Sequence, residues 1–186
     1  MKVLSKSRFK LGLECPNKLF FTSNKEYANQ KSENPFMKAL ASGGFQVEEL
    51  ARLHYPEGIL IKDPKEHDKY DYFDLSNQTK ELLKNENVVI FEAAFLVENL
   101  FVRTDILVKK GKQIKLIEVK AKAIDSKDTN IFLNKSGKIE SDWKPYLFDV
   151  AFQKYVIEKS FPEFKVTPYL MLADKSKSTS CEYKQL

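Results

Sequence analysis

The sequence predicts a single α/β domain with a mixed central sheet flanked by helices. Helical spacing dominates the N-terminal quarter, and three runs rich in β-branched and apolar residues follow between residues 88 and 120. One more helix and one more strand complete the pattern. The length of 186 residues suits one domain with a substantial core, and no internal repeat or domain-scale linker divides it. Residues 1–186 are therefore expected to fold together.

The N-terminal quarter is predicted to hold two helices. The first covers residues 4–21, with Ser5 or Ser7 as its N-cap and a break near Pro16, whose ring cannot continue a helix. The second runs over residues 35–53, where apolar residues recur at helical spacing.

The rest of the chain alternates strands and helices. A polar insertion at residues 124–145 separates the central strands from the last helix. The expected strands cover 59–61, 88–97, 100–108, 113–120 and 166–173, and the expected helices cover 75–85 and 147–159.

Two of these strands are predicted to form a hairpin that carries a pair of acids. Residues 100–108 and 113–120 are joined by a short glycine-containing turn. If the hairpin closes on Lys110-Gly111, Asp105 lies opposite Leu116, and Glu118 is its diagonal neighbour at roughly 7–8 Å. Side chains alternate along a strand, so Glu118 and Lys120 share one face. The two carboxylates are expected to be close enough to share one cation, and a one-residue bulge would bring them nearer.

A third acid is predicted to join this pair. The strand over 88–97 returns into 100–107 across the two-residue turn Glu98-Asn99, and in that register Glu92 falls opposite Asp105. Like charges paired on a mostly apolar sheet repel each other unless a counter-ion lies between them. Carboxylate oxygens suit Mg²⁺ or Mn²⁺ better than zinc. The alternative is that all of these side chains line a solvated sheet face.

Composition and charge narrow the classes of partner. Hydrophobic residues make up 42% and charged residues 31% of the chain, as in soluble globular proteins. No run approaches the roughly 18 apolar residues of a membrane span, and the first residues lack a signal peptide's apolar stretch. A cytoplasmic protein with no membrane partner is therefore expected.

The basic residues favour nucleic acid as the partner. The net charge is +5 and the pI is about 9.0, and lysines cluster at 109–115, 120–127 and 135–144, which flank the predicted acids. The alternative is that these lysines are solubilising loop charges.

Five short motifs follow one another along the chain: Leu4-Ser5-Lys6-Ser7 with Cys15-Pro16, Gly44-x-x-Val47-Glu48, Arg103-Thr104-Asp105-Ile106-Leu107, Ile117-Glu118-Val119-Lys120, and Asp149-x-x-x-Gln153. In this order they resemble the PD-(D/E)XK nuclease superfamily, and specifically its RecB-like branch, which includes the CRISPR-associated exonucleases. Three of the motifs depart from the branch: Glu48 stands where many relatives have a histidine, arginine and threonine (Arg103-Thr104) stand in place of a small residue, and Ile157 stands in place of a tyrosine.

The resemblance implies a restriction-endonuclease-like core and a function. The chain would be a nuclease that needs Mg²⁺ or Mn²⁺ and hydrolyses phosphodiester bonds of DNA, acting as an exonuclease in repair or defence. The implied catalytic residues are Asp105, Glu118, Lys120 and Gln153. The implied metal ligands are Glu48 (or its neighbour Glu49), Glu92, Asp105, Glu118 and the backbone carbonyl of Val119.

The cysteines and the C-terminal tail bear on cofactors and completeness. Iron–sulfur members of the branch use four cysteines, whereas this chain has only Cys15 and Cys181, so no such cluster is expected from this chain alone. The tail ends soon after the last predicted strand, which leaves open a longer protein with an additional C-terminal domain or protein partner.

Two other functions stay open at this point. One is a nucleic-acid-binding module that keeps the fold and does not cleave. The other is a carbohydrate- or protein-binding domain whose acids are surface charges.

Overall fold

A computed structural model of the chain confirms the α/β fold class and describes residues 3–22, 24, 26, 35–62, 71–128 and 130–177. For residues 35–42 the structure describes the backbone alone. The helices are α1 (Lys6–Glu14), α2 (Pro16–Phe21), α3 (Pro35–Arg52), α4 (Tyr72–Leu82) and α5 (Lys144–Ser160). The strands are β1 (Leu4–Ser5), β2 (Ile59–Leu60), β3 (Asn87–Phe91), β4 (Ala94–Val97), β5 (Leu100–Arg103), β6 (Ile106–Lys110), β7 (Gln113–Ile124) and β8 (Lys165–Asp174).

The strands form two mixed sheets. The larger has the order β2-β3-β6-β7-β8, in which β2–β3 and β7–β8 are parallel pairs and the two middle pairs are antiparallel. The smaller has the order β1-β5-β4. The parallel pair β7–β8 is connected through α5, as parallel neighbours require a crossover.

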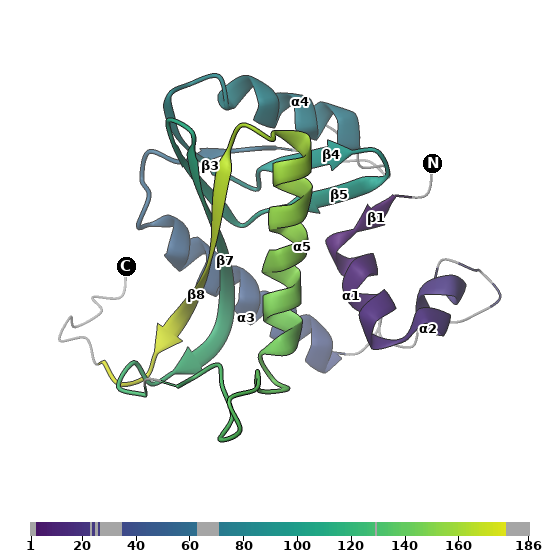
Figure 1. Cartoon of the computed structure of the whole chain (residues 1–186), viewed down its shortest axis with the longest axis vertical. Coiled ribbons are helices and arrows are strands. Elements are labelled where there is room, and N and C mark those ends of the chain that lie inside the picture. The colour runs from purple at the N-terminus through teal and green to yellow at the C-terminus, as the bar shows by residue number, and fades with distance from the viewer. Residues whose placement is uncertain are drawn as a thin grey trace.

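Helices cover both faces of the larger sheet, with α5 in front of it and α3 behind it in Figure 1. Alternating strand residues serve the two sides, because neighbouring side chains point to opposite faces. The α5 side buries Ile90, Leu107, Ile114 and Leu116 with Phe152, Val156 and Ile157. The α3 side buries Val89, Phe91, Ile106, Val108, Ile117 and Val119 with Ala51.

The first predicted helix is divided in two, as the sequence suggests. Ser5 caps α1 by accepting a hydrogen bond from the Arg8 N–H, and Cys15 adopts extended backbone between α1 and α2. Pro16 begins α2 at a position where a proline is tolerated. The break at Cys15 changes the direction of the chain between α1 and α2. The N-terminal end of α1 lies beside the smaller sheet, because β1 directly precedes α1 and pairs with β5.

Two other helices begin earlier than predicted because of their first turns. Asp71 precedes α4, and its carboxylate accepts the N–H groups of Phe73 and Asp74. Pro145 occupies the first turn of α5, where its missing N–H costs nothing.

The predicted strand over 100–108 is wrong as one strand, since it belongs to two sheets. Phe91 pairs with Ile106 and Ala94 pairs with Arg103 in one continuous register. Between these pairs the chain leaves strand geometry, and Glu92 has φ +57°. The long hairpin therefore bends between the two sheets next to Asp105.

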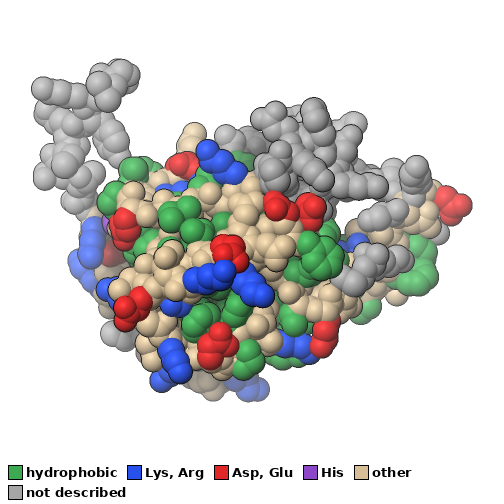
Figure 2. All heavy atoms as spheres, turned by 90° about the horizontal axis from the view of Figure 1, so that it is seen from above, with side chains coloured by type: hydrophobic (Ala, Val, Ile, Leu, Met, Phe, Trp, Pro, Cys, Tyr) green, Lys and Arg blue, Asp and Glu red, His purple; other side chains and the backbone are tan. Residues whose placement is uncertain are grey.

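The structure contains no membrane-spanning helix among the described residues: none of them is long and apolar enough. Figure 2 shows basic, acidic and hydrophobic side chains interspersed on the face seen from above.

Candidate functional site

The hairpin of β6 and β7 brings Asp105 and Glu118 closer than the predicted register would. Lys110 pairs with Gln113, so the two-residue turn is Gly111-Lys112 rather than Lys110-Gly111. Gly111 has φ +55° at the first turn position, which a two-residue hairpin turn requires and glycine adopts without strain. The pairing of Ile106 with Ile117, continued by one residue, places Asp105 directly across from Glu118. The predicted diagonal arrangement is therefore wrong by two residues.

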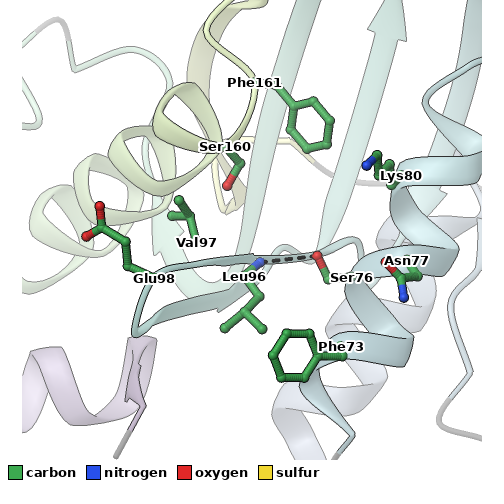
Figure 3. Close-up of a pocket in the computed structure, with 9 residues that line it drawn as sticks. All are labelled: Phe73, Ser76, Asn77, Lys80, Leu96, Val97, Glu98, Ser160 and Phe161. Carbon is green, nitrogen blue, oxygen red and sulfur yellow. Dashed lines mark hydrogen bonds between the residues drawn. The ribbon is translucent and has the colours of Figure 1, made fainter. Parts of the chain in front are cut away.

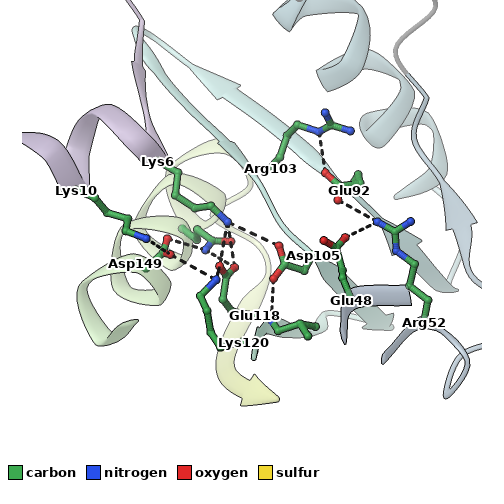
Figure 4. A network of polar contacts seen from close by, with 12 residues as sticks. Lys6, Lys10, Glu48, Arg52, Glu92, Arg103, Asp105, Glu118, Lys120 and Asp149 are labelled. Carbon is green, nitrogen blue, oxygen red and sulfur yellow. Dashed lines mark hydrogen bonds and ion pairs between the residues drawn. The ribbon is translucent and has the colours of Figure 1, made fainter. Parts of the chain in front are cut away.

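A lysine from α1 lies between these two carboxylates. The Nζ of Lys6 is 3.0 and 3.2 Å from the two carboxylate oxygens of Glu118 and 3.7 Å from Oδ1 of Asp105. The other oxygen of Asp105 accepts the Val119 N–H at 2.7 Å. Figure 4 shows Lys6 reaching from α1 to the sheet acids. The two predicted acids are thus brought together, and the positively charged Lys6 ammonium contacts both of them.

Glu118 is the centre of a buried polar network. Its side chain is fully buried, so the reading that Glu118 lines a solvated sheet face is wrong. It is bound by the ammonium of Lys120 and accepts a 2.7 Å hydrogen bond from the Gln153 side-chain amide. Gln153 also donates to the buried Asp149 at 3.1 Å. The Gln153 amide therefore connects Glu118 to Asp149.

The lysines and the burial set the ionisation of these acids in opposite directions. Burial would raise the pKa of Glu118, but Lys6 and Lys120 outweigh it and lower the pKa to about 2. Burial and the charge of Glu118 raise the pKa of Asp105 to about 6, against the opposing effect of the same two lysines. Burial would lower the pKa of Lys6, but Glu118 and Asp105 outweigh it and raise that pKa. At neutral pH the network therefore holds two close negative charges and a firmly protonated lysine.

Glu48 and Glu92 form a second acidic cluster beside the first. Arg52 on α3 binds Glu48 and lies 3.0 Å from Glu92, and Arg103 lies 3.1 Å from the other oxygen of Glu92. The backbone N–H of Glu92 donates to the Asp105 carbonyl at 3.2 Å, which confirms that these two residues are opposite each other. Burial and a hydrogen bond to Glu48 raise the pKa of Glu92 to about 7, although Arg103 acts in the other direction.

The first cluster suits a divalent ion by its chemistry. The described residues contain no group of three or more Asp, Glu, His or Cys side chains arranged to hold a metal ion. The pair Asp105 and Glu118 is what the structure offers, and Mg²⁺ is commonly bound through one or two carboxylates with water completing its shell. The ammonium of Lys6 stands between these oxygens as a cation would. The roles as metal ligands stay predictions for all of the implied residues: Asp105, Glu118, Glu48, Glu92 and the Val119 carbonyl.

Three residues of the network were missed as site members from the sequence. Lys6 was noted only as the variable position of the opening motif, and Lys10 on the next turn of α1 is 3.4 Å from Asp149. Asp149, four residues before Gln153, is buried among these lysines. A usable signal existed for Asp149, since the i, i+4 spacing puts both side chains on one helix face.

Two hollows meet at Lys6 and Ser7. One, of about 340 Å³, is lined by Ser5, Lys6, Ser7, Tyr72, Glu92, Phe101, Arg103 and Asp105. The other, of about 820 Å³, is lined by basic residues of α1 and α5 together with apolar ones, including Lys10, Leu13, Lys144 and Phe148. We call these two adjoining hollows the channel. Asp105 lines it, and so do the basic residues Lys6, Lys10, Lys144 and Arg103 and the acids Glu14 and Glu92.

A separate hollow lies away from the acids. It has a volume of about 310 Å³ between α4, the β4–β5 hairpin and the end of α5, and Figure 3 shows Phe73 and Phe161 at it. The Ser76 hydroxyl there accepts the Leu96 N–H at 3.3 Å, which ties α4 to β4. Its polar groups thus serve the fold.

Cys15 lies half-buried at the break between α1 and α2, and Cys181 lies outside the described residues.

No family model matches the chain, and a search of the curated proteins gave no match. The family resemblance therefore stays a prediction from the motifs.

Proposed function

We propose that the chain is a divalent-metal-dependent nuclease that hydrolyses phosphodiester bonds of DNA in the cytoplasm, acting on DNA ends in repair or defence. The observation that carries this proposal is a polar cluster in which Glu118 and Gln153 are buried and Asp105 and Lys120 are half-buried, beside the hollow that Asp105 and Lys6 line. Two carboxylates this close, one of them fully buried, are costly without a cation, which points to a site.

The acids and their neighbours have distinct roles in this proposal. Asp105 and Glu118 hold Mg²⁺ or Mn²⁺, with the Val119 carbonyl as a further oxygen ligand. The bound ion supplies Lewis-acid stabilisation and an activated water. Gln153 fixes the orientation of the Glu118 carboxylate through its amide. Lys120 contacts the same carboxylate and offsets negative charge that develops on the phosphate.

The lysines along the channel support a polyanionic substrate. Lys10 and Lys144 line the larger hollow, and Lys6 and Arg103 line the smaller one. Exposed Phe148 adds an aromatic ring at the larger hollow, where an unpaired base can stack. Phosphates bound along these cations would pass next to Asp105 and Glu118.

One observation favours the alternative of a non-cleaving nucleic-acid-binding module. Lys6 gives Asp105 and Glu118 a positively charged partner from within the chain. The remaining alternative, a domain whose acids are surface charges, fits poorly because Glu118 is fully buried.

The test is cleavage of end-labelled linear single- and double-stranded DNA, beside closed circles, in Mg²⁺, Mn²⁺ or EDTA. Glu118→Ala and Lys120→Ala are the site variants. Lys84→Ala is the matched control, because Lys84 is an exposed lysine paired to a glutamate on α4.

We expect metal-dependent cutting that both site variants abolish and the control retains, with the circles spared. Cutting that survives both site variants would refute the assignment of the site. Tight, salt-sensitive binding without cutting in any metal would favour the binding module.

A further inference from the structure

The side chain of Lys6 points towards the two sheet acids rather than into solvent. Lys6 begins α1, 112 residues before Glu118 in sequence, and its side chain is only 23% exposed. Its ammonium contacts both oxygens of Glu118 and faces Asp105. Lys120 already binds Glu118 from β7, so Lys6 is a second cation on one carboxylate. What Lys6 adds is the bridge between the two acids.

The charges of the network balance only while Lys6 is in place. Three carboxylates, those of Asp105, Glu118 and Asp149, face three ammonium groups. A divalent ion bound by Asp105 and Glu118 would add two positive charges to this half-buried cluster. Like charges at such short range in a poorly solvated place repel strongly. One of the lysines therefore has to leave when the ion arrives.

Lys6 is the lysine with a way out. It alone of the three lies between Asp105 and Glu118, where the ion would be held. It also lines both hollows, so that rotation of its side chain takes the ammonium into open space without moving α1. Lys10 contacts Asp149 and lines only the larger hollow. Lys120 lines neither of these hollows.

We propose that Lys6 is an internal counter-ion that occupies the metal position in the metal-free protein, is displaced by a divalent ion, and then binds a phosphate of the substrate in the adjoining hollow. This inference rests on the proposed function and assigns Lys6 a role in it. The exchange keeps the acid pair compensated before the ion binds and supplies a cation for the substrate afterwards. It also makes the protein bind metal more weakly than its acids alone would.

The first test measures Mn²⁺ binding to the full chain. The EPR signal of free Mn²⁺ reports how much of the ion is not bound. Lys6→Met removes the charge and keeps much of the apolar stem, and Lys6→Arg keeps the charge. Lys10→Met is the matched control, one turn later on the same helix and paired with Asp149.

We expect Lys6→Met to bind Mn²⁺ about tenfold more tightly than the wild-type protein, since a charged hydrogen bond no longer competes. Lys6→Arg should stay near wild type, and Lys10→Met should change the affinity by less than about threefold. Binding by Lys6→Met with none detected in the wild-type protein up to millimolar Mn²⁺ would show that the ion does not displace Lys6, and it would overturn the proposal.

Failure of this inference and failure of the proposed function give different results. If the wild-type protein binds Mn²⁺ and Lys6→Met binds no more tightly, Lys6 does not compete with the ion, and the proposed function stands. If neither protein binds Mn²⁺ at millimolar concentrations, both are refuted.

A second measurement uses the wild-type protein, so it holds even if Lys6→Met fails to fold. Acetylation by an N-hydroxysuccinimide ester, read by mass spectrometry, reports how accessible each lysine is. Lys6 should be protected in EDTA and react several-fold faster in Mg²⁺, whereas exposed Lys84 should be unchanged. Equal protection of Lys6 in both conditions, at a Mg²⁺ concentration that stabilises the protein, would overturn the displacement.

Discussion

Replacing Asp105 by Asn should stabilise the metal-free protein at alkaline pH. The change removes one negative charge from the pair with Glu118, and the new side-chain carbonyl can still accept the Val119 N–H. The raised pKa of Asp105, about 6 against an ordinary 3.8, reflects burial first and the charge of Glu118 second. At 1.36 kcal/mol per pKa unit this interval corresponds to about 3 kcal/mol. Partial exposure of the carboxylate, 16%, reduces the expected gain to about 2 kcal/mol.

The pH dependence of this gain gives the test its sign. A carboxyl group whose pKa is raised on folding contributes stability that is complete below about pH 3.8 and is lost as the pH rises through about 6. Asn does not titrate, so the two proteins should converge towards pH 4 and differ fully at pH 8. At that pH the melting temperature in EDTA should rise by about 4–8 °C.

The assay is thermal unfolding in EDTA over pH 4.5–8.5, beside Asp128→Asn as the control. Asp128 is exposed and accepts a backbone N–H that Asn can equally accept, so its replacement should change little. Saturating Mg²⁺ should stabilise the wild-type protein and leave Asp105→Asn unchanged, because ligand binding stabilises only the protein that binds it. A gain that is the same at every pH, or a loss at pH 8, would refute the electrostatic account of the pair.

Four further substitutions have defined outcomes. Glu118→Gln should lower the free energy of unfolding by about 2–3 kcal/mol at pH 8. Because the pKa of Glu118 is lowered to about 2, this difference should fade as the pH falls below 4.5 towards 2. Urea titrations at several pH values measure the difference, and a difference that does not change with pH would contradict the prediction. Gln153→Leu should cost about 1–3 kcal/mol in the same titration, since Glu118 loses a buried donor, and an unchanged midpoint would show that the amide is dispensable. Gly58→Ala should cost about 2–3 kcal/mol of stability, because the new Cβ would lie 2.1 Å from the Phe91 ring. Gly111→Ala should cost about 1 kcal/mol, because its Cβ would meet open space but its backbone has φ +55°. If thermal melts show the reverse order, both arguments are contradicted.

Local patterns made much of the fold predictable. The turn Glu98-Asn99 fixes the register of the strands on either side, and the observed pairing of Val97 with Leu100 follows from it. The turn after β6 was placed one residue too early in Lys109-Lys110-Gly111-Lys112. Gly111 belongs at the first turn position, and because a hairpin pairs residues on both strands, that error moved Asp105 by two residues relative to Glu118.

The composition of the site depended on contacts that local patterns do not carry. Glu118 was placed on the correct strand, but its burial follows from β7 lying between β6 and β8 in the sheet and being covered by α5. Lys6 reaches the acids only because α1 packs near α5, at a separation of more than a hundred residues. Glu92 was correctly placed opposite Asp105, yet its left-handed backbone and its two arginine partners depend on the bend between the sheets.

The most direct test of the central claim is a crystal structure with Mn²⁺, in which anomalous scattering locates the ion. We expect an anomalous peak within ligand distance of the Asp105 and Glu118 carboxylates, with the Lys6 ammonium moved out into one of the adjoining hollows. A peak bound elsewhere would contradict the metal site on which the proposed nuclease depends, whereas Lys6 still between the two carboxylates with the ion bound at them would contradict only the displacement.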